Sequence, residues 1–94
     1  DPNAIPSNIV AIGNIVLNRY VQPDRALRIY EVAIQIDPSS VEAHYGIATA
    51  YQSQGKLNKA IEKIENYINR YGDEPSLTNA KKTLESLYSA ERKK

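Results

Sequence analysis

The stretch that decides the fold is VEAHYGIATAYQSQGKLNKAIEKIENYINRYG, which runs from residue 41 to residue 72. Its apolar residues recur at the i, i+3, i+4, i+7 spacing that places side chains on one face of a helix. The two successive stripes are His44, Ile47, Ala48 and Tyr51, and then Leu57, Ala60, Ile61, Ile64, Tyr67 and Ile68. Gly55 separates them, because glycine readily adopts the left-handed backbone that closes a helix. The stretch therefore predicts two helices joined by a short turn.

A pair of the same kind precedes this one. A shift of 34 residues places Ala26 on Ala60, and a shift of 35 places Gly13 on Ala48. The apolar stripes of this earlier pair are Ile9, Ile12, Gly13 and Val16, and then Ala26, Leu27, Tyr30, Ala33 and Ile34. The second of these helices ends at Asp37-Pro38, and Ser39-Ser40-Val41-Glu42 has the spacing of a capping box that starts the next helix.

A fifth stripe follows the second pair and consists of Leu77, Ala80, Leu84, Leu87 and Tyr88. Strand signals are weak, because no Asn-Gly or Asp-Gly turn separates alternating runs. The rest of the fifth helix is polar, as expected of a helix on which nothing stacks. The sequence therefore predicts an all-α chain of five helices with short connections.

The repeated pair resembles the tetratricopeptide repeat family, whose 34-residue unit has the pattern W-x2-L-G-x2-Y, A-x3-F, P. The second copy fills it with His44, Ile47, Ala48, Tyr51, Ala60 and Ile64, and the first with Ile9, Ile12, Gly13, Val16, Ala26, Tyr30 and Pro38. His44 and Ile9 replace the usual Trp, and Gly72 stands where the second copy's Pro is expected. The resemblance implies an α-α superhelix, or solenoid, of five antiparallel-packed helices. It would form a single domain over residues 1–94, with repeat 1 at about 6–40, repeat 2 at about 41–74 and a capping helix at about 75–91.

The amino-acid composition limits the classes of function that the chain can have. The 94 residues are 41% hydrophobic and 24% charged, which is typical of one globular domain. The chain has no Cys, and its aromatic residues are seven Tyr. The net charge of +1 gives no preference for a polyanion, so we expect no nucleic-acid partner, and single-stranded RNA binding is the least supported alternative. No apolar run approaches the roughly 20 residues of a membrane span.

No catalytic pattern is present in the sequence. His44, the one histidine, lies on a core stripe, which favours a packing or hydrogen-bonding role over that of a ligand or base. Without Cys it cannot build the usual zinc site. There is no glycine-rich phosphate loop and no G-x-S-x-G motif. We therefore expect no enzyme activity, no metal and no cofactor.

In the tetratricopeptide repeat family, the first helix of each pair lines a concave groove that binds partner peptides or proteins. The resemblance thus implies a protein-interaction scaffold whose groove comprises Val10, Asn14, Leu17, Asn18, Tyr45, Thr49, Gln52 and Lys82. Tyr45 is the strongest candidate, because it lies off the core stripe and offers contact area together with a hydroxyl group. Chaperone-binding members hold a C-terminal carboxylate with a five-position clamp. Asn14 alone matches it here, so we predict no binding of chaperone tails.

The first helix also presents an apolar edge. Ile12 and Ile15 are expected to point toward the place where a preceding unit would stack, and residues 2–18 contain no charged side chain. Two explanations stay open at this point. The chain is a fragment that lacks the repeat before it, or it self-assembles into a homo-oligomer through this edge. The sequence does not indicate the partner or the cellular compartment.

Overall fold

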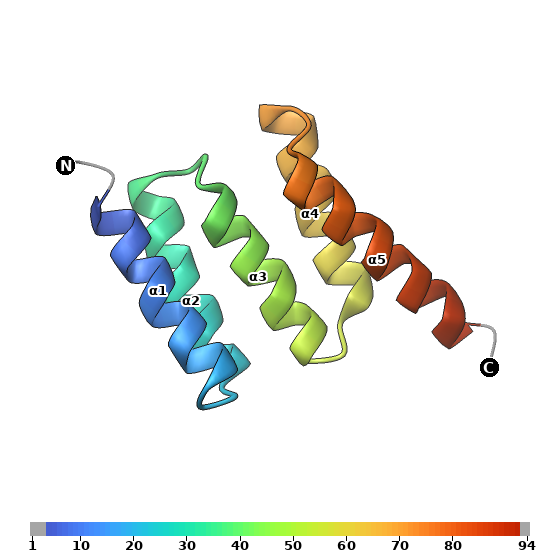
Figure 1. Cartoon of the computed structure of the whole chain (residues 1–94), viewed down its shortest axis with the longest axis horizontal. Helices are drawn as coiled ribbons and strands as arrows, with labels where there is room; N and C mark the ends of the chain where they lie inside the picture. Colours follow the sequence, from blue (N-terminus) through green and yellow to red (C-terminus); the bar gives the residue numbers. More distant parts are fainter. Residues whose placement is uncertain (1–3, 93–94) are drawn as a thin grey trace.

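The computed structural model describes residues 4–92, which form five α-helices (Figure 1). The helices are α1 (Ala4–Asn18), α2 (Pro23–Ile36), α3 (Val41–Ser53), α4 (Leu57–Tyr71) and α5 (Pro75–Arg92). The predicted all-α fold of five helices is confirmed. The predicted domain extends to residues 1–3 and 93–94, which lie outside the described part of the chain.

Local sequence explains where the helices begin and end. The Ser40 hydroxyl accepts a hydrogen bond from the Ala43 N–H at 3.2 Å, so Ser40 is the N-cap of α3. The predicted box, with Ser39 as the cap, is displaced by one residue. Gly55 follows α3 with φ +78° and Gly72 follows α4 with φ +97°, both in the left-handed region that glycine adopts without strain.

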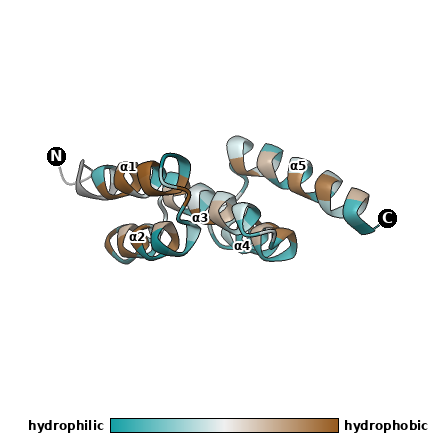
Figure 2. Cartoon of the chain, turned by 90° about the horizontal axis from the view of Figure 1, so that it is seen from below, coloured by the Kyte–Doolittle hydropathy of each residue, from teal (hydrophilic) through white to brown (hydrophobic). Residues whose placement is uncertain are grey.

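The helices form two layers of a short solenoid. Each helix packs against its neighbour in sequence, and α3 also contacts both α1 and α5. Seen along the edge, α1 and α5 lie above α2 and α4 (Figure 2). The molecule measures 47 × 32 × 16 Å along its principal axes. Helix α3 lies between α1 and α5 and contacts both, so these three helices share one face of the molecule (Figure 2).

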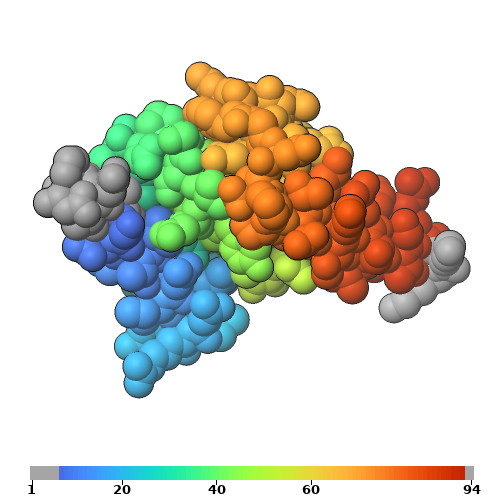
Figure 3. Space-filling view, turned by 45° about the horizontal axis from the view of Figure 1, so that its top comes forward, coloured from blue at the N-terminus to red at the C-terminus, as the bar shows by residue number. Residues whose placement is uncertain are grey.

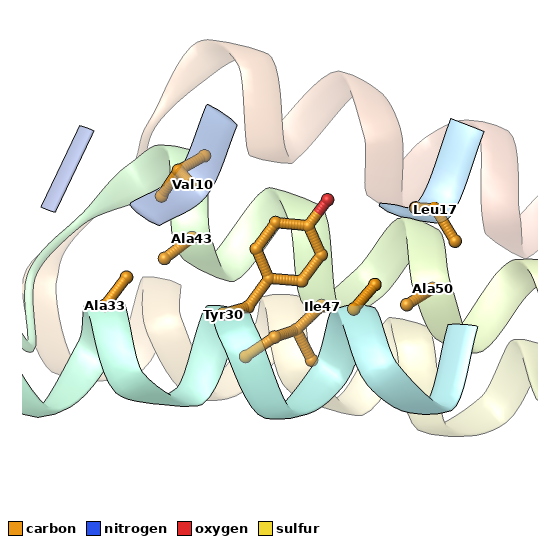
Figure 4. Close-up of a cluster of buried hydrophobic side chains, with 8 residues drawn as sticks. Val10, Leu17, Tyr30, Ala33, Ala43, Ile47 and Ala50 are labelled. Carbon is orange, nitrogen blue, oxygen red and sulfur yellow. The ribbon is translucent and has the colours of Figure 1, made fainter. Parts of the chain in front are cut away.

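Two apolar clusters share α3. The first joins α1, α2 and α3 through Val10, Leu17, Ala26, Tyr30, Ala33, Ala43, Ile47 and Ala50 (Figure 4). The second joins α3, α4 and α5 through Ala48, Leu57, Ala60, Ile64, Tyr67, Leu77 and Leu84. Ile47 and Ala48 are adjacent in sequence but point into different clusters. No helical pair buries its apolar face alone, so the stability of each pair depends on its neighbour.

Tyr30 is the largest fully buried side chain of the first cluster (Figure 4). Its ring lies between two glycines. A Cβ atom built on Gly13 of α1 would lie 2.7 Å from the Tyr30 ring. A Cβ atom built on Gly46 of α3 would lie 2.5 Å from it. The ring therefore occupies space that a side chain on either helix would need.

Ile12 shares its stripe with the half-buried Ile9 and Val16, but it is exposed, as the sequence predicts for the apolar edge of α1. Ile12 is 53% exposed, whereas Val10 and Leu17 are buried at 3% and 5%. Ile47, which occupies the same repeat position as Ile12, is covered by the first helical pair. No described element covers Ile12, because α1 is the first helix of the described chain. Leu87 of the predicted α5 stripe is likewise exposed.

We predict that Gly46→Ala lowers the free energy of unfolding by about 1–3 kcal/mol, because the added methyl overpacks against Tyr30. We expect this loss even though alanine favours a helix over glycine by about 1 kcal/mol. Urea unfolding measures the change. In a Tyr30→Leu background the penalty should shrink or reverse, since the ring is gone. An equal penalty in both backgrounds would contradict the assigned contact.

Candidate partner-binding groove

The face that α1, α3 and α5 share is hollowed. The main hollow has a volume of about 420 Å³ and is lined by Val10, Asn14, Leu17, Asn18, Tyr30, Val41, Glu42, Tyr45, Gly46, Thr49 and Ser76. Most of these residues come from α1 and α3, and Ser76 comes from the start of α5. Figure 3 shows this part of the molecule, with α1 in blue and α5 in orange on either side of the green atoms of α3.

The floor of the main hollow is apolar. Val10 and Leu17 are almost completely buried, yet they reach the hollow from below. The Tyr30 ring and the backbone of Gly46 complete the floor. Val10 and Leu17 were predicted as groove residues. They line it as parts of the first core cluster rather than as exposed side chains. Such a floor favours an apolar side chain of a ligand.

The rim of the main hollow carries hydrogen-bonding groups. The Tyr30 hydroxyl donates to Asn14 Oδ1 at 2.5 Å, which fixes the amide of Asn14 and leaves its NH₂ group to donate outward. Burial raises the pKa of Tyr30, so its hydroxyl stays protonated and remains a donor at neutral pH. Thr49 donates from its hydroxyl to the Tyr45 carbonyl at 3.0 Å. The buried Tyr30 thus orients the amide group of Asn14, which is exposed at the rim.

A small hollow adjoins the main one on the other side of α3. Its volume is about 110 Å³, and it is lined by Tyr45, Ala48, Thr49, Gln52, Ala80, Thr83 and Leu84. Tyr45 and Thr49 line both hollows and form a ridge between them. Tyr45 is 46% exposed, so its ring is available to a ligand on this ridge.

Charge is sparse around both hollows. Glu42 supplies the carboxylate of the main hollow, and neither hollow is lined by a Lys or Arg. Helix α1 has no charged residue between Ala4 and Asn18. Lys81 forms an ion pair with Glu65 at 3.6 Å, away from either lining. The groove is therefore weakly negative rather than basic.

Most of the predicted groove residues come together in the structure. Six of the eight line the main hollow, namely Val10, Asn14, Leu17, Asn18, Tyr45 and Thr49. Gln52 lines the small hollow, and Lys82 is exposed on α5 but lines neither. Its place on the third helix also predicted Glu42 as a groove residue, whereas the lining residues Tyr30, Val41, Gly46 and Ser76 were not predicted. The internal repeat could have indicated Ser76, because a shift of 34 residues places Glu42 on Ser76.

His44 lies outside both hollows and has a structural role. Its Nε2 atom donates to the Pro38 carbonyl at 2.8 Å, and its ring centroid lies 4.8 Å from that of Tyr67. The Tyr67 hydroxyl donates to the Ser39 carbonyl at 2.9 Å. The two side chains thus satisfy adjacent carbonyls of the turn between α2 and α3. Within residues 4–92 no three His, Asp or Glu side chains gather closely enough to hold a metal ion.

Burial lowers the pKa of His44 below its ordinary value of 6.5, and the hydrogen bond to Pro38 only partly opposes this. The unfolded chain therefore takes up a proton first as the pH falls. We predict that the free energy of unfolding has its full value above about pH 6.5. It should decrease as the pH falls from there toward the lower pKa that His44 has in the folded chain. Urea unfolding between about pH 7 and pH 5 measures the slope. His44→Gln keeps an amide donor for the Pro38 carbonyl but does not titrate, and should flatten this slope. An unchanged slope would assign the pH dependence to other groups.

Comparison with known proteins agrees with this geometry. The tetratricopeptide repeat model matches residues 22–84. Sperm-associated antigen 1 of Mus musculus is 35% identical over 86 residues, which cover 92% of this chain and 9% of that protein. The chain thus corresponds to a small part of this relative. No solved structure matches the chain significantly. None of the helices within residues 4–92 combines the length and apolar content needed to cross a bilayer.

Proposed function

Because this chain belongs to the tetratricopeptide repeat family, we propose that it is a non-catalytic scaffold that binds a partner peptide or protein in its groove. Members of the family generally mediate protein–protein interactions and are typically without catalytic activity. The observation that carries the proposal is the main hollow, with its apolar floor and its rim of amide and hydroxyl groups. A few polar groups around an apolar cavity are typical of a binding site.

The division of the chain into two repeats, at about 6–40 and about 41–74, with a capping helix at about 75–91, is part of this proposal. The character of α5 supports it. A shift of 34 residues places Thr78, Lys82 and Glu85 where α3 has His44, Ala48 and Tyr51. These α3 side chains are buried or half-buried, whereas of the three α5 residues only Thr78 is half-buried, and Lys82 and Glu85 are exposed. Helix α5 thus offers a polar surface at this end of the stack, as a capping helix must.

Tyr45 is the residue on which peptide binding should depend most. It lies on the ridge between the two hollows, where a bound chain would contact it from both sides. An aromatic side chain in such a place contributes a large contact area at low entropic cost. Half of its surface is free, so its removal opens no cavity in either core cluster.

We predict that Tyr45→Ala weakens binding of a groove peptide by at least about tenfold, which corresponds to about 1.4 kcal/mol. Peptides selected from a display library against the whole chain, titrated by calorimetry, provide the measurement. The melting temperature should stay unchanged. Tyr20→Ala is the matched control, because Tyr20 is exposed and lines neither hollow. Equal affinities for the two variants would place the binding site elsewhere.

A second candidate function is self-association through the open end of the first helical pair. Ile12 and Ile15 of α1 are 53% and 51% exposed, and Val32 and Ile36 of α2 are exposed as well. The repeat shift places Val32 and Ile36 level with Asn66 and Arg70, which face α2 from α4. The four apolar side chains thus occupy the end face that a neighbouring unit would cover. No corresponding observation favours single-stranded RNA binding.

We predict a concentration-dependent dimer in sedimentation equilibrium at tens of micromolar, if this end face mediates assembly. Ile12→Lys combined with Ile15→Lys should shift the equilibrium to monomer, because two charges would have to be desolvated. The double variant should keep its helical signal, since both residues are exposed. A wild-type chain that stays monomeric at this concentration would eliminate self-association.

A further inference from the structure

We propose that the groove selects an extended peptide with three features: a large apolar side chain, a small side chain two or three residues away, and a basic side chain next to the large one. This inference rests on the proposed function and specifies the chemistry of the partner. Its three parts come from the sizes of the two hollows, from the ridge of α3 that separates them, and from the charge of their linings.

Size distinguishes the two hollows. The main hollow, at about 420 Å³, has room for a leucine or an aromatic ring above Val10, Leu17 and Tyr30. The small hollow, at about 110 Å³, is narrower and lies against Ala48, Ala80 and neighbouring side chains of α3 and α5. The small hollow is about a quarter of the volume of the main one, so it favours the smaller of two side chains, such as alanine, serine or threonine. The pair of hollows therefore recognises a large and a small side chain in a fixed order across α3.

The separation of the hollows sets the spacing of the two side chains. The hollows lie on opposite sides of α3 and share the ridge of Tyr45 and Thr49. Packed helices lie about 8–10 Å apart, and an extended chain advances about 3.3–3.6 Å per residue. Side chains two or three residues apart therefore span the ridge. A spacing of two also places both on the same side of an extended peptide.

Charge supplies the third feature. Glu42 is exposed and lines the main hollow, and neither lining includes a Lys or Arg. Glu74 adds a second carboxylate nearby, since it accepts a hydrogen bond from the Ser76 hydroxyl at 3.0 Å. Helix α1 contributes no compensating cation between Ala4 and Asn18. This end of the groove therefore attracts a basic side chain and repels an acidic one.

Amide groups along the groove would hold the peptide backbone. The Asn14 amide is fixed by Tyr30 and has its donors free, and Asn18 and Gln52 lie farther along the two hollows. Side-chain amides both donate and accept, so they pair with peptide groups whatever the side chains of the ligand. The two hollows and Glu42 then determine which peptide side chains are preferred.

The experiment uses the full chain and an octapeptide display library. The enriched sequences should contain a large apolar residue flanked by Lys or Arg, with a small residue two or three positions away. Synthetic peptides with blocked ends then carry Lys, Gln or Glu at the flanking position. We expect the Lys form to bind at least about fivefold more tightly than the Gln form at low salt, and the Glu form most weakly.

Matched variants test the two features separately. Glu42→Gln should abolish the preference for Lys, whereas Glu31→Gln, an exposed carboxylate on α2, should leave it unchanged. Thr83→Leu narrows the small hollow and should reduce the affinity for the small-residue peptide at least fivefold, whereas Ser86→Leu on the same helix should not. Tyr45-dependent binding without a charge or size preference would overturn this inference and leave the proposed function standing. If no peptide depends on Tyr45, the proposed function fails, and this inference fails with it.

Discussion

The contact between Tyr30 and two glycines constrains the rest of the structure. Its ring lies against Gly13 of α1 and Gly46 of α3, with no space for a Cβ atom on either helix. Two helices from different pairs thus approach one side chain of α2, and the first pair joins the second around it. The same ring also reaches the floor of the main hollow. The interaction that connects the pairs therefore also forms part of the lining of the candidate site.

The hydroxyl groups of the tyrosines give this packing a second consequence. A phenylalanine would fill the place of Tyr30 but would leave Asn14 without its donor. Tyr67 behaves in the same way in the second cluster, where its ring packs in the core and its hydroxyl satisfies the Ser39 carbonyl. A chain with seven Tyr and no Phe or Trp thus uses aromatic packing to orient polar groups at turns and at the groove.

Periodicity and the internal repeat were sufficient to predict the five helices, their connections and most core positions. They did not determine how α1 is covered, because a periodic pattern shows which residues share a face but not which element packs on it. Ile12 matches Ile47 in the repeat, yet it is exposed at the open end, while Val10 and Leu17 are buried. The pattern also did not predict every residue that lines the groove. Tyr30 contributes to the lining from α2, the helix of the pair that was not expected to line the groove.

The two ends of the solenoid differ, and this difference limits what can pack there. Helix α5 presents Lys82 and Glu85 at one end, whereas the first pair exposes Ile12, Ile15, Val32 and Ile36 at the other. Covering these side chains removes apolar surface from water, and each Å² of apolar surface that is buried stabilises the contact by about 25 cal/mol. The internal interface cannot be copied there, because the repeat position of Gly46 is Ala11 in α1. An aromatic ring placed as Tyr30 is placed would meet the Cβ atom of Ala11. A surface that packs on this end must therefore present a smaller side chain at that point.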